Sequence, residues 1–378
     1  MIEKLFLSDK YMNRILSIVF SCILVSSCVN DSRERNITSL SNFQIDFINA
    51  PELDFEEKVD TFYYIPLETG KNNLLGEISK IQIDSVISVL DGMNQTIHLY
   101  SLNGKLMTVI DKKGMGPGEY VQLGDFYTSS KERYVELLDP MKKKVMRYDF
   151  SGNFIKEISL PFPNGVSRFT KFNGYYLFDQ QTRRNDEKWK YSIVVISEDG
   201  KIINKFFPYT KYADILLSSR SSFYNINNEL HYVPIYCDTV FALDENSVIP
   251  KYSVDFSDKW VDESFVYSEV KNPMDFINKL KDCDFITFLN VLETDSTIWL
   301  DFMYKEQKYC ALINKINLNV STYSINESKN CGDLMGEILT SWNNYFIMPI
   351  NAEQLNQKLG LKGENDNNPY IVFVQFKS

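Results

Sequence analysis

A turn that recurs at a fixed interval constrains the fold of this chain more than any other feature of its sequence. Three glycines, at positions 104, 152 and 200, lie 48 residues apart, and each follows an asparagine, a serine or an aspartate. Pairs of this kind accept a positive φ at little energetic cost, so each one predicts the turn of a β-hairpin. The three predicted hairpins are residues 100–110, 148–158 and 196–206.

Further strands precede each hairpin and complete a four-stranded unit. Ile87–Asp91, Tyr134–Asp139 and Tyr175–Asp179 each give a third strand, and a fourth strand comes before each of them. Four antiparallel strands that recur at about 40–50 residues are typical of β-propeller blades, which bury their faces by stacking on one another. Solenoids are the alternative, but they usually repeat at shorter intervals.

The rest of the chain predicts three more blades. Their strands are Glu229–Pro234, Thr239–Leu243, Phe285–Leu292, Thr297–Met303, Lys308–Asn314, Val320–Ile325, Leu334–Thr340, Tyr345–Ile350 and Tyr370–Phe376. The last blade lacks one strand, which Thr61–Leu67 can supply, and this closure removes the exposed sheet edges. Residues 61–378 would give 53 residues per blade for six blades and about 45 for seven. Because equivalent turns lie 48 residues apart, seven blades would leave too few residues for each blade, and six blades fit the chain. We therefore expect an all-β, six-bladed propeller of four-stranded antiparallel blades, with an N-terminal strand closing the last blade.

The composition supports this fold and limits the partners. The chain has 23 tyrosines and 26 phenylalanines, which favour strands and provide material for a large core. Its formal net charge is −10, which argues against a nucleic-acid partner.

The N-terminus carries an export signal. Met12 to Arg14 form a short positive start, Ile15–Val25 an apolar stretch, and two serines precede Cys28. This is the plan of a secretory signal peptide, and the apolar stretch is shorter than the roughly 20 residues that cross a bilayer. The segment resembles a bacterial lipoprotein signal, which implies cleavage before Cys28 and acyl chains on that cysteine. The alternative is an ordinary cleaved signal in which Cys28 stands by chance.

These observations predict three parts. Residues 1–27 are the signal peptide, with Met12 as the expected true start, and residues 28–60 are the lipidated cysteine and a polar, flexible tether. Residues 61–378 are the propeller.

Three motifs stand out in the predicted propeller: Tyr64–Glu68, Lys113–Tyr120 and Tyr236–Phe241. With these motifs the chain resembles a known family, the NHL-like six-bladed propeller lipoproteins of the Bacteroidota type. The resemblance implies the propeller fold and a location in the bacterial cell envelope, at the outer membrane, and it implies no shared reaction. The periplasmic or surface side of that membrane stays open.

The cysteines leave the redox state open. Apart from Cys22 in the signal and Cys28, the chain has Cys237, Cys283, Cys310 and Cys331. Export allows disulfides among these four, with three alternative pairings, whereas buried free thiols are the commoner explanation. No Cys-x-x-Cys occurs and His98 and His231 are the only histidines, so a zinc site of familiar spacing is not expected.

Three long connections suggest where a binding site lies. In blade 3 the second strand ends 21 positions before the turn glycine, compared with 13 in blades 1 and 2. The link between blades 4 and 5, about Ser257–Asp284 with a short helix expected at Met274–Lys281, and Asn351–Asn368 in blade 6 are also long. Strand order places all three on one face, and long loops on a rigid scaffold usually carry binding sites. Candidate contacts in them are Arg183, Arg184, Trp189 and Trp260. The alternative is a solvated charged loop, with Trp260 packed locally.

Evidence for catalysis is weaker. Four aspartates, Asp91, Asp139, Asp179 and Asp238, stand at or near equivalent loops and could converge at the axis as acid–base groups or as an axial calcium site. Aspartates in turns more often bond their own backbone. Neither histidine lies in a triad setting, and His231 is expected to be packed. The glycines of 114–118 predict a tight connection between blades, because they lack the spacing of a phosphate-binding loop.

The sequence thus favours a lipid-anchored envelope protein that binds without catalysis, or acts as a scaffold. Its ligand on the long-loop face would be a glycan, a peptide or a partner envelope protein, with no cofactor expected. The alternative is a hydrolase or lyase that acts on glycans, with acidic residues on the same face.

Overall fold

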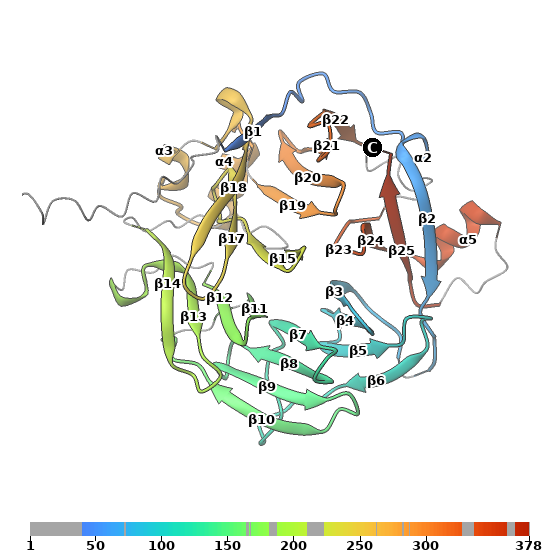
Figure 1. Ribbon diagram of the computed structural model, residues 1–378, viewed down its shortest axis with the longest axis vertical. Helices are drawn as coiled ribbons and strands as arrows, with labels where there is room; N and C mark the ends of the chain where they lie inside the picture. Colours follow the sequence, from blue (N-terminus) through green and yellow to red (C-terminus); the bar gives the residue numbers. More distant parts are fainter. Residues whose placement is uncertain are drawn as a thin grey trace, which may run out of the picture. The chain divides into compact units, whose positions relative to one another are not determined.

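The computed structural model describes residues 40–71, 73–163, 166, 168–180, 187–209, 223–261, 263–281, 283–286, 288–326, 336–360 and 367–377. The chain divides into two units, Met1–Leu40 and Ser41–Ser378. Within the second unit, six β-sheets form a ring of blades (Figure 1). The predicted all-β, six-bladed propeller is therefore confirmed.

Each blade contains four antiparallel strands, and in blades 1 to 5 these follow one another along the chain from the centre outward (Figure 1). Blades 1 to 3 consist of β3 (Ile78–Ile83), β4 (Ile87–Asp91), β5 (Thr96–Tyr100), β6 (Leu106–Ile110); β7 (Asp125–Ser129), β8 (Tyr134–Asp139), β9 (Lys144–Asp149), β10 (Phe154–Ser159); and β11 (Arg168–Phe172), β12 (Tyr175–Asp179), β13 (Tyr191–Ile196), β14 (Ile202–Pro208). Blades 4 and 5 consist of β15 (Phe223–Ile226), β16 (Glu229–Tyr232), β17 (Thr239–Leu243), β18 (Val248–Asp255); and β19 (Leu289–Glu293), β20 (Thr297–Tyr304), β21 (Gln307–Asn314), β22 (Val320–Ile325).

Blade 6 joins the two ends of the propeller. It contains β23 (Thr340–Trp342), β24 (Tyr345–Ile350), β25 (Tyr370–Phe376) and, as its outermost strand, β2 (Val59–Pro66) from the start of the chain. Strands β2 and β25 pair in antiparallel register from Val59 opposite Phe376 to Pro66 opposite Tyr370. The closing strand predicted at Thr61–Leu67 thus takes the expected place.

The repeated hairpin turns have the geometry that their sequences predict. Gly104, Gly152 and Gly200 have φ angles of 82°, 79° and 83°. In each turn the glycine N–H donates to the carbonyl of the residue three positions earlier, at 2.9 Å. A side chain is strained at such φ angles, which explains why glycine recurs there.

The segment before β2 packs on the propeller, which corrects the predicted extent of the tether. Strand β1 (Ser41–Gln44) pairs in parallel with β18 and adds a fifth strand to blade 4. The chain then passes blade 5, where Ser324 exchanges backbone hydrogen bonds with Pro51 and Leu53, and reaches α2 (Phe55–Lys58) before β2 (Figure 1). We call residues 41–58 the strap. They belong to the folded body, although they were predicted as part of a flexible tether.

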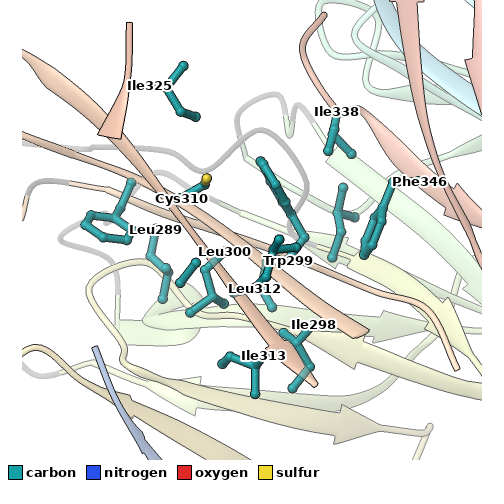
Figure 2. Packing of buried hydrophobic residues seen from close by; sticks show 14 of the residues in the cluster. Leu289, Ile298, Trp299, Leu300, Cys310, Leu312, Ile313, Ile325, Ile338 and Phe346 are labelled. Carbon is teal, nitrogen blue, oxygen red and sulfur yellow. The ribbon is translucent and has the colours of Figure 1, made fainter. Parts of the chain in front are cut away.

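Buried apolar side chains fill the spaces between blades. Figure 2 shows this packing around blade 5, where Trp299 of β20 is fully buried. Its ring stacks on Phe376 of blade 6, with centroids 5.3 Å apart. Because β20 is covered on both sides, its side chains are buried almost without interruption, unlike those of a strand with one wet face.

Candidate functional site

The strand order gives the propeller two distinct ends. Successive strands of a blade run in opposite directions, so the turns between second and third strands and the links between blades emerge at one end. We call this end the long-loop face and the other end the short-turn face. The second-to-third turns of blades 1 and 2 are short, at residues 92–95 and 140–143.

The three expanded connections lie together on the long-loop face. Residues 180–190 include the 3₁₀ turn η1 (Glu187–Trp189), and the link between β18 and β19 includes η2 (Ser257–Lys259), α3 (Glu263–Val266) and α4 (Pro273–Lys281). The connection between β24 and β25 contains α5 (Ala352–Leu359). Figure 1 shows α3 and α4 beside blade 4 and α5 beside blade 6. The helix predicted at Met274–Lys281 corresponds to α4.

Of the three ligand contacts predicted in blade 3, the structure describes only Trp189. Arg183 and Arg184 lie outside the described residues. Trp189 is buried, and its ring packs against Phe162 at a centroid distance of 5.3 Å. The ammonium group of Lys205 lies 5.4 Å from the centre of the same ring. Trp189 therefore anchors its loop to the blade, which corrects its prediction as an exposed ligand contact.

Trp260 lines a small cavity between blades 4 and 5. Its ring is half-buried and stacks on Phe256, with centroids 5.6 Å apart and planes 12° apart. The other walls come from the β16–β17 turn and from the link to β19. The lining residues are Val233, Pro234, Ile235, Tyr236, Cys237, Trp260, Val261, Ile286, Phe288 and Leu289. Of the described candidate contacts predicted from the sequence, Trp260 lines this cavity and Trp189 does not.

The side chains that line the cavity are mostly apolar. The β16–β17 turn, which forms one of its walls, has an unusual backbone conformation. Burial raises the pKa of the Cys237 thiol, so this group stays protonated at neutral pH. Tyr236 has a φ of 59°, and Cys237 N–H closes the turn by donating to the Pro234 carbonyl at 3.1 Å. A bulky residue at positive φ is uncommon and often marks a functional loop. Among the described residues that line the cavity, none is Asp, Glu, Lys, Arg or His, and its volume of about 20 Å³ leaves room for a small apolar group.

Asp91 and Asp139 hold loops together. The Asp91 carboxylate accepts hydrogen bonds from the N–H groups of Gly76, Glu77 and Asn94 at 2.8, 3.2 and 3.0 Å. Burial opposes its ionisation, but these bonds and one from the Asn94 side chain keep the pKa of Asp91 below its usual range. Asp139 accepts equivalent bonds from the N–H groups of Val121, Met141 and Lys142. Each carboxylate ties a turn to the link that enters its blade.

The four aspartates do not gather at one site. Asp179 is buried at the end of β12, and the Asp238 carboxylate accepts from the Thr239 hydroxyl at 2.8 Å. Across the part of the chain that the structure describes, no three His, Cys, Asp or Glu side chains are placed to hold a metal ion. The acidic cluster and axial calcium site considered from the sequence are thus not assembled by these residues. Cys237, Cys283 and Cys310 are free thiols, and Cys331 lies outside the described residues.

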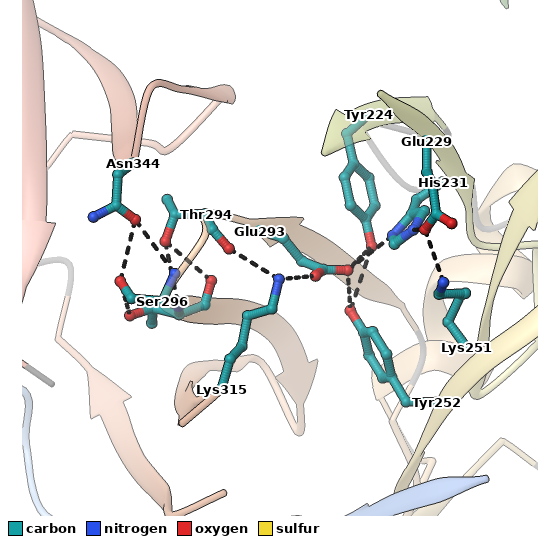
Figure 3. Close-up of polar contacts among 11 residues, drawn as sticks. Tyr224, Glu229, His231, Lys251, Tyr252, Glu293, Thr294, Ser296, Lys315 and Asn344 are labelled. Carbon is teal, nitrogen blue, oxygen red and sulfur yellow. Dashed lines mark hydrogen bonds and ion pairs between the residues drawn. The ribbon is translucent and has the colours of Figure 1, made fainter. Parts of the chain in front are cut away.

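A buried polar network joins blades 4 and 5 near the short-turn face. Figure 3 shows its centre, Glu293, at the end of β19. One Glu293 oxygen accepts from Tyr224 and Tyr252 hydroxyls at 2.8 and 2.7 Å and lies 3.0 Å from His231 Nδ1. The other oxygen accepts from Lys315 Nζ at 2.8 Å. Burial opposes the charge on Glu293, but the His231 and Lys315 contacts outweigh it and lower the pKa to about 2.

This network could not be identified from the sequence, although His231 was expected to be packed. The three blade 4 residues that contact Glu293 lie 41 to 69 positions before it in the sequence. Only the stacking of neighbouring blades brings them together. Because Tyr224, Tyr252 and Glu293 are buried and sit against one another, the network stabilises the interface between blades.

Comparison with known proteins places this fold in a family. A family model described as DUF5128, 6-bladed β-propeller, matches residues 32–349. Among solved structures, a Bacteroides fragilis NCTC 9343 protein described as exported has a TM-score of 0.75 and 18% identity, covering 89% of this chain and 99% of that chain. A DUF4221 family member from Bacteroides vulgatus ATCC 8482 has a TM-score of 0.56 and 11% identity, covering 84% and 97%. A search of curated proteins finds no match. At these identities the two structures establish likeness of fold.

Among the helices that the structure describes, none is both long and apolar enough to cross a bilayer.

Proposed function

This chain belongs to the DUF5128 family of six-bladed β-propellers, and we propose that it is an exported, lipid-anchored envelope protein that binds a peptide or partner protein on its long-loop face. The observation that carries the proposal is the cavity beside Trp260. It lies on the long-loop face, which also carries the three expanded connections, and the side chains of its walls are mostly apolar or aromatic. Concave apolar sites of this kind bind ligands more often than other parts of a protein surface.

The lining favours binding over catalysis. A glycan hydrolase or lyase requires a positioned acid, base or metal, and the lining residues that the structure describes include no ionisable side chain other than Tyr236 and the protonated Cys237 thiol. A small apolar group of a peptide side chain matches these walls. A flat sugar ring stacked on Trp260 is the competing ligand.

Export and anchoring rest on the N-terminal sequence. The positive start, the apolar stretch and Cys28 follow the plan of a lipoprotein signal. The Bacteroides fragilis protein of similar fold is described as exported, which supports the same route here. The resemblance to NHL-like lipoproteins supports an outer-membrane location.

Replacing the anchoring cysteine tests the membrane attachment. In Cys28→Ser, the mature protein should move from the membrane fraction to the soluble envelope fraction, because acylation supplies the hydrophobic anchor. Fractionation with immunoblotting measures this shift, and Cys22→Ser is the matched control, since position 22 lies in the predicted signal. Membrane retention of Cys28→Ser equal to that of the control would count against the anchor.

A charge placed in the cavity tests the binding site. Ile235→Asp should weaken binding of peptides selected from a random library by at least tenfold, because an unpaired carboxylate is costly in an apolar pocket. Affinities are measured by calorimetry on the mature chain. The matched control is Ile316→Asp, since Ile316 is 81% exposed in the β21–β22 turn on the short-turn face.

Two results would contradict the proposed function. If Ile235→Asp and Ile316→Asp bind the selected peptides equally well, the cavity is not the site. If a glycan array yields ligands that the peptide library does not, and Ile235→Asp removes their binding, the ligand class is wrong. Release of new reducing ends from such glycans would favour the enzymatic alternative.

A further inference from the structure

Blades 1 and 2 carry an unusual row of apolar side chains on the long-loop face. Met93 and Met141 occupy equivalent places in the second-to-third turns of the two blades, and Met115 lies in the link between the blades. These side chains are 69%, 65% and 80% exposed. Leu74 and Val121, in the links that enter the two blades, are exposed as well. We call these five residues the methionine strip. Exposed apolar groups that gather in this way mark interaction surfaces.

Hydrogen bonds connect the loops that carry the strip. Lys113 Nζ donates to the Asn94 carbonyl at 3.0 Å, which ties the loop of Met115 to the turn of Met93. Lys142 Nζ donates to the Gly116 carbonyl at 3.2 Å, which ties the same loop to the turn of Met141. The Asn94 amide also donates to the Leu74 carbonyl at 3.4 Å. The loops that carry the strip are therefore linked to one another across the two blades.

The base of the strip is rigid while its side chains are adaptable. The turns of Met93 and Met141 are fixed by the buried carboxylates of Asp91 and Asp139 described above. Methionine side chains have three rotatable bonds and a polarisable sulfur, so they adjust to different apolar partners. A rigid base limits the entropy that is lost when a partner binds.

Lysines border the strip together with two carboxylates that have partners in the same loops: Asp111 pairs with Lys113, and Glu119 accepts from the Gly116 N–H. Lys112 is exposed beside the Met115 loop and forms no ion pair with a described carboxylate. The Lys142 ammonium group bonds to the backbone carbonyls of Gly116 and Glu119, and that of Lys143 bonds to the carbonyl of Pro163; neither forms an ion pair with a carboxylate that the structure describes. A partner with carboxylates at the matching places would be attracted to this border.

We propose that the methionine strip binds a segment of a partner protein that is apolar on one side and acidic along its edges. The apolar side would cover the methionines and the acidic edges would meet the three lysines. A second copy of this chain is a poorer occupant, because it would bring like-charged lysines together. This inference rests on the proposed function, since it adds a second contact area on the face assigned to a partner.

Methionine methyl NMR on the full mature chain tests the proposal. The probe is a synthetic amphipathic helix of leucine and glutamate. It should shift the methyl signals of Met93, Met115 and Met141 saturably and leave those of buried Met348 and exposed Met274 in place. A helix of leucine and lysine should bind at least tenfold more weakly.

Variants locate the binding and separate it from the cavity. M93S/M115S/M141S should weaken binding of the acidic helix at least tenfold. The control I203S/I249S/I316S removes the same number of exposed apolar side chains elsewhere and should not. Ile235→Asp should leave this binding unchanged, so the strip and the cavity can fail separately. Equal binding of both helices, equal loss in both triple variants, or shifts produced only by vesicles of phosphatidylethanolamine and phosphatidylglycerol would overturn the proposal.

Discussion

Replacing Phe47 by alanine should lower the free energy of unfolding by about 3–5 kcal/mol, the usual range for a large aromatic side chain removed from a core. Phe47 is almost fully buried in the strap. Its ring makes edge-on contacts with Phe302, Tyr304 and Tyr309 of blade 5, at centroid distances of 5.3, 5.1 and 5.1 Å, and with Phe256 at 6.3 Å. The side chain thus joins the strap to two blades.

Urea denaturation followed by tryptophan fluorescence measures this change, and the neighbouring residue is the control. Ile48 is exposed, so Ile48→Ala should change the free energy of unfolding by less than about 0.5 kcal/mol. If the two variants unfold at the same urea concentration, the strap does not stabilise the propeller. A large loss for Phe47→Ala would instead show that the folded body begins before β2.

The fold was predictable because residues that are close together in the sequence indicate the strands and turns of each blade. Strands β4, β8, β12, β17, β22, β24 and β25 have the predicted bounds. The start and end of a strand follow from a short pattern of alternating side chains and from nearby turn residues such as Gly104. The six-blade count followed from the interval between turns, which is also a property of the sequence alone.

The strap was missed because its partners are distant. Phe43, Ile45 and Phe47 alternate with polar residues, which is a strand signal, but they stand alone in a polar stretch beside an export signal. The pairing of β1, which contains Phe43, with β18 joins residues about 210 positions apart. No local pattern distinguishes such a strand from an extended tether.

The candidate site was predictable only in outline. Loop lengths and strand order indicated that the three expanded connections share one face, because both are properties of topology. They could not tell Trp189, which packs against Phe162, from Trp260, which lines a cavity. The methionine strip was also missed, because Met93 and Met141 become a surface only when Met115 of the intervening link lies between them.

Replacing Glu293 by glutamine should remove about 3 kcal/mol from the free energy of unfolding at pH 7. The folded pKa of Glu293 is about 2, compared with an ordinary value of 4.5, and each pKa unit corresponds to about 1.4 kcal/mol. Glutamine retains the size of the side chain but leaves Lys315 and His231 without their shared anion. Denaturant titration at pH 7 measures the loss, and exposed Glu77→Gln should change little.

The same variant should also remove part of the acid sensitivity of the protein. Because the folded pKa of Glu293 is depressed, its stabilisation is fully present above about pH 4.5 and is lost as the pH falls towards 2. The wild type should therefore lose more stability than Glu293→Gln between these pH values.

Glu198 is a second carboxylate that would contribute to acid sensitivity. Its contacts with Lys171 and Arg147 outweigh its partial burial and lower its pKa to about 2 as well. Its side chain is 43% exposed, so solvent screens its charge and Glu198→Gln should have the smaller effect. Equal slopes in the wild type and Glu293→Gln would place the acid sensitivity outside the interface of blades 4 and 5.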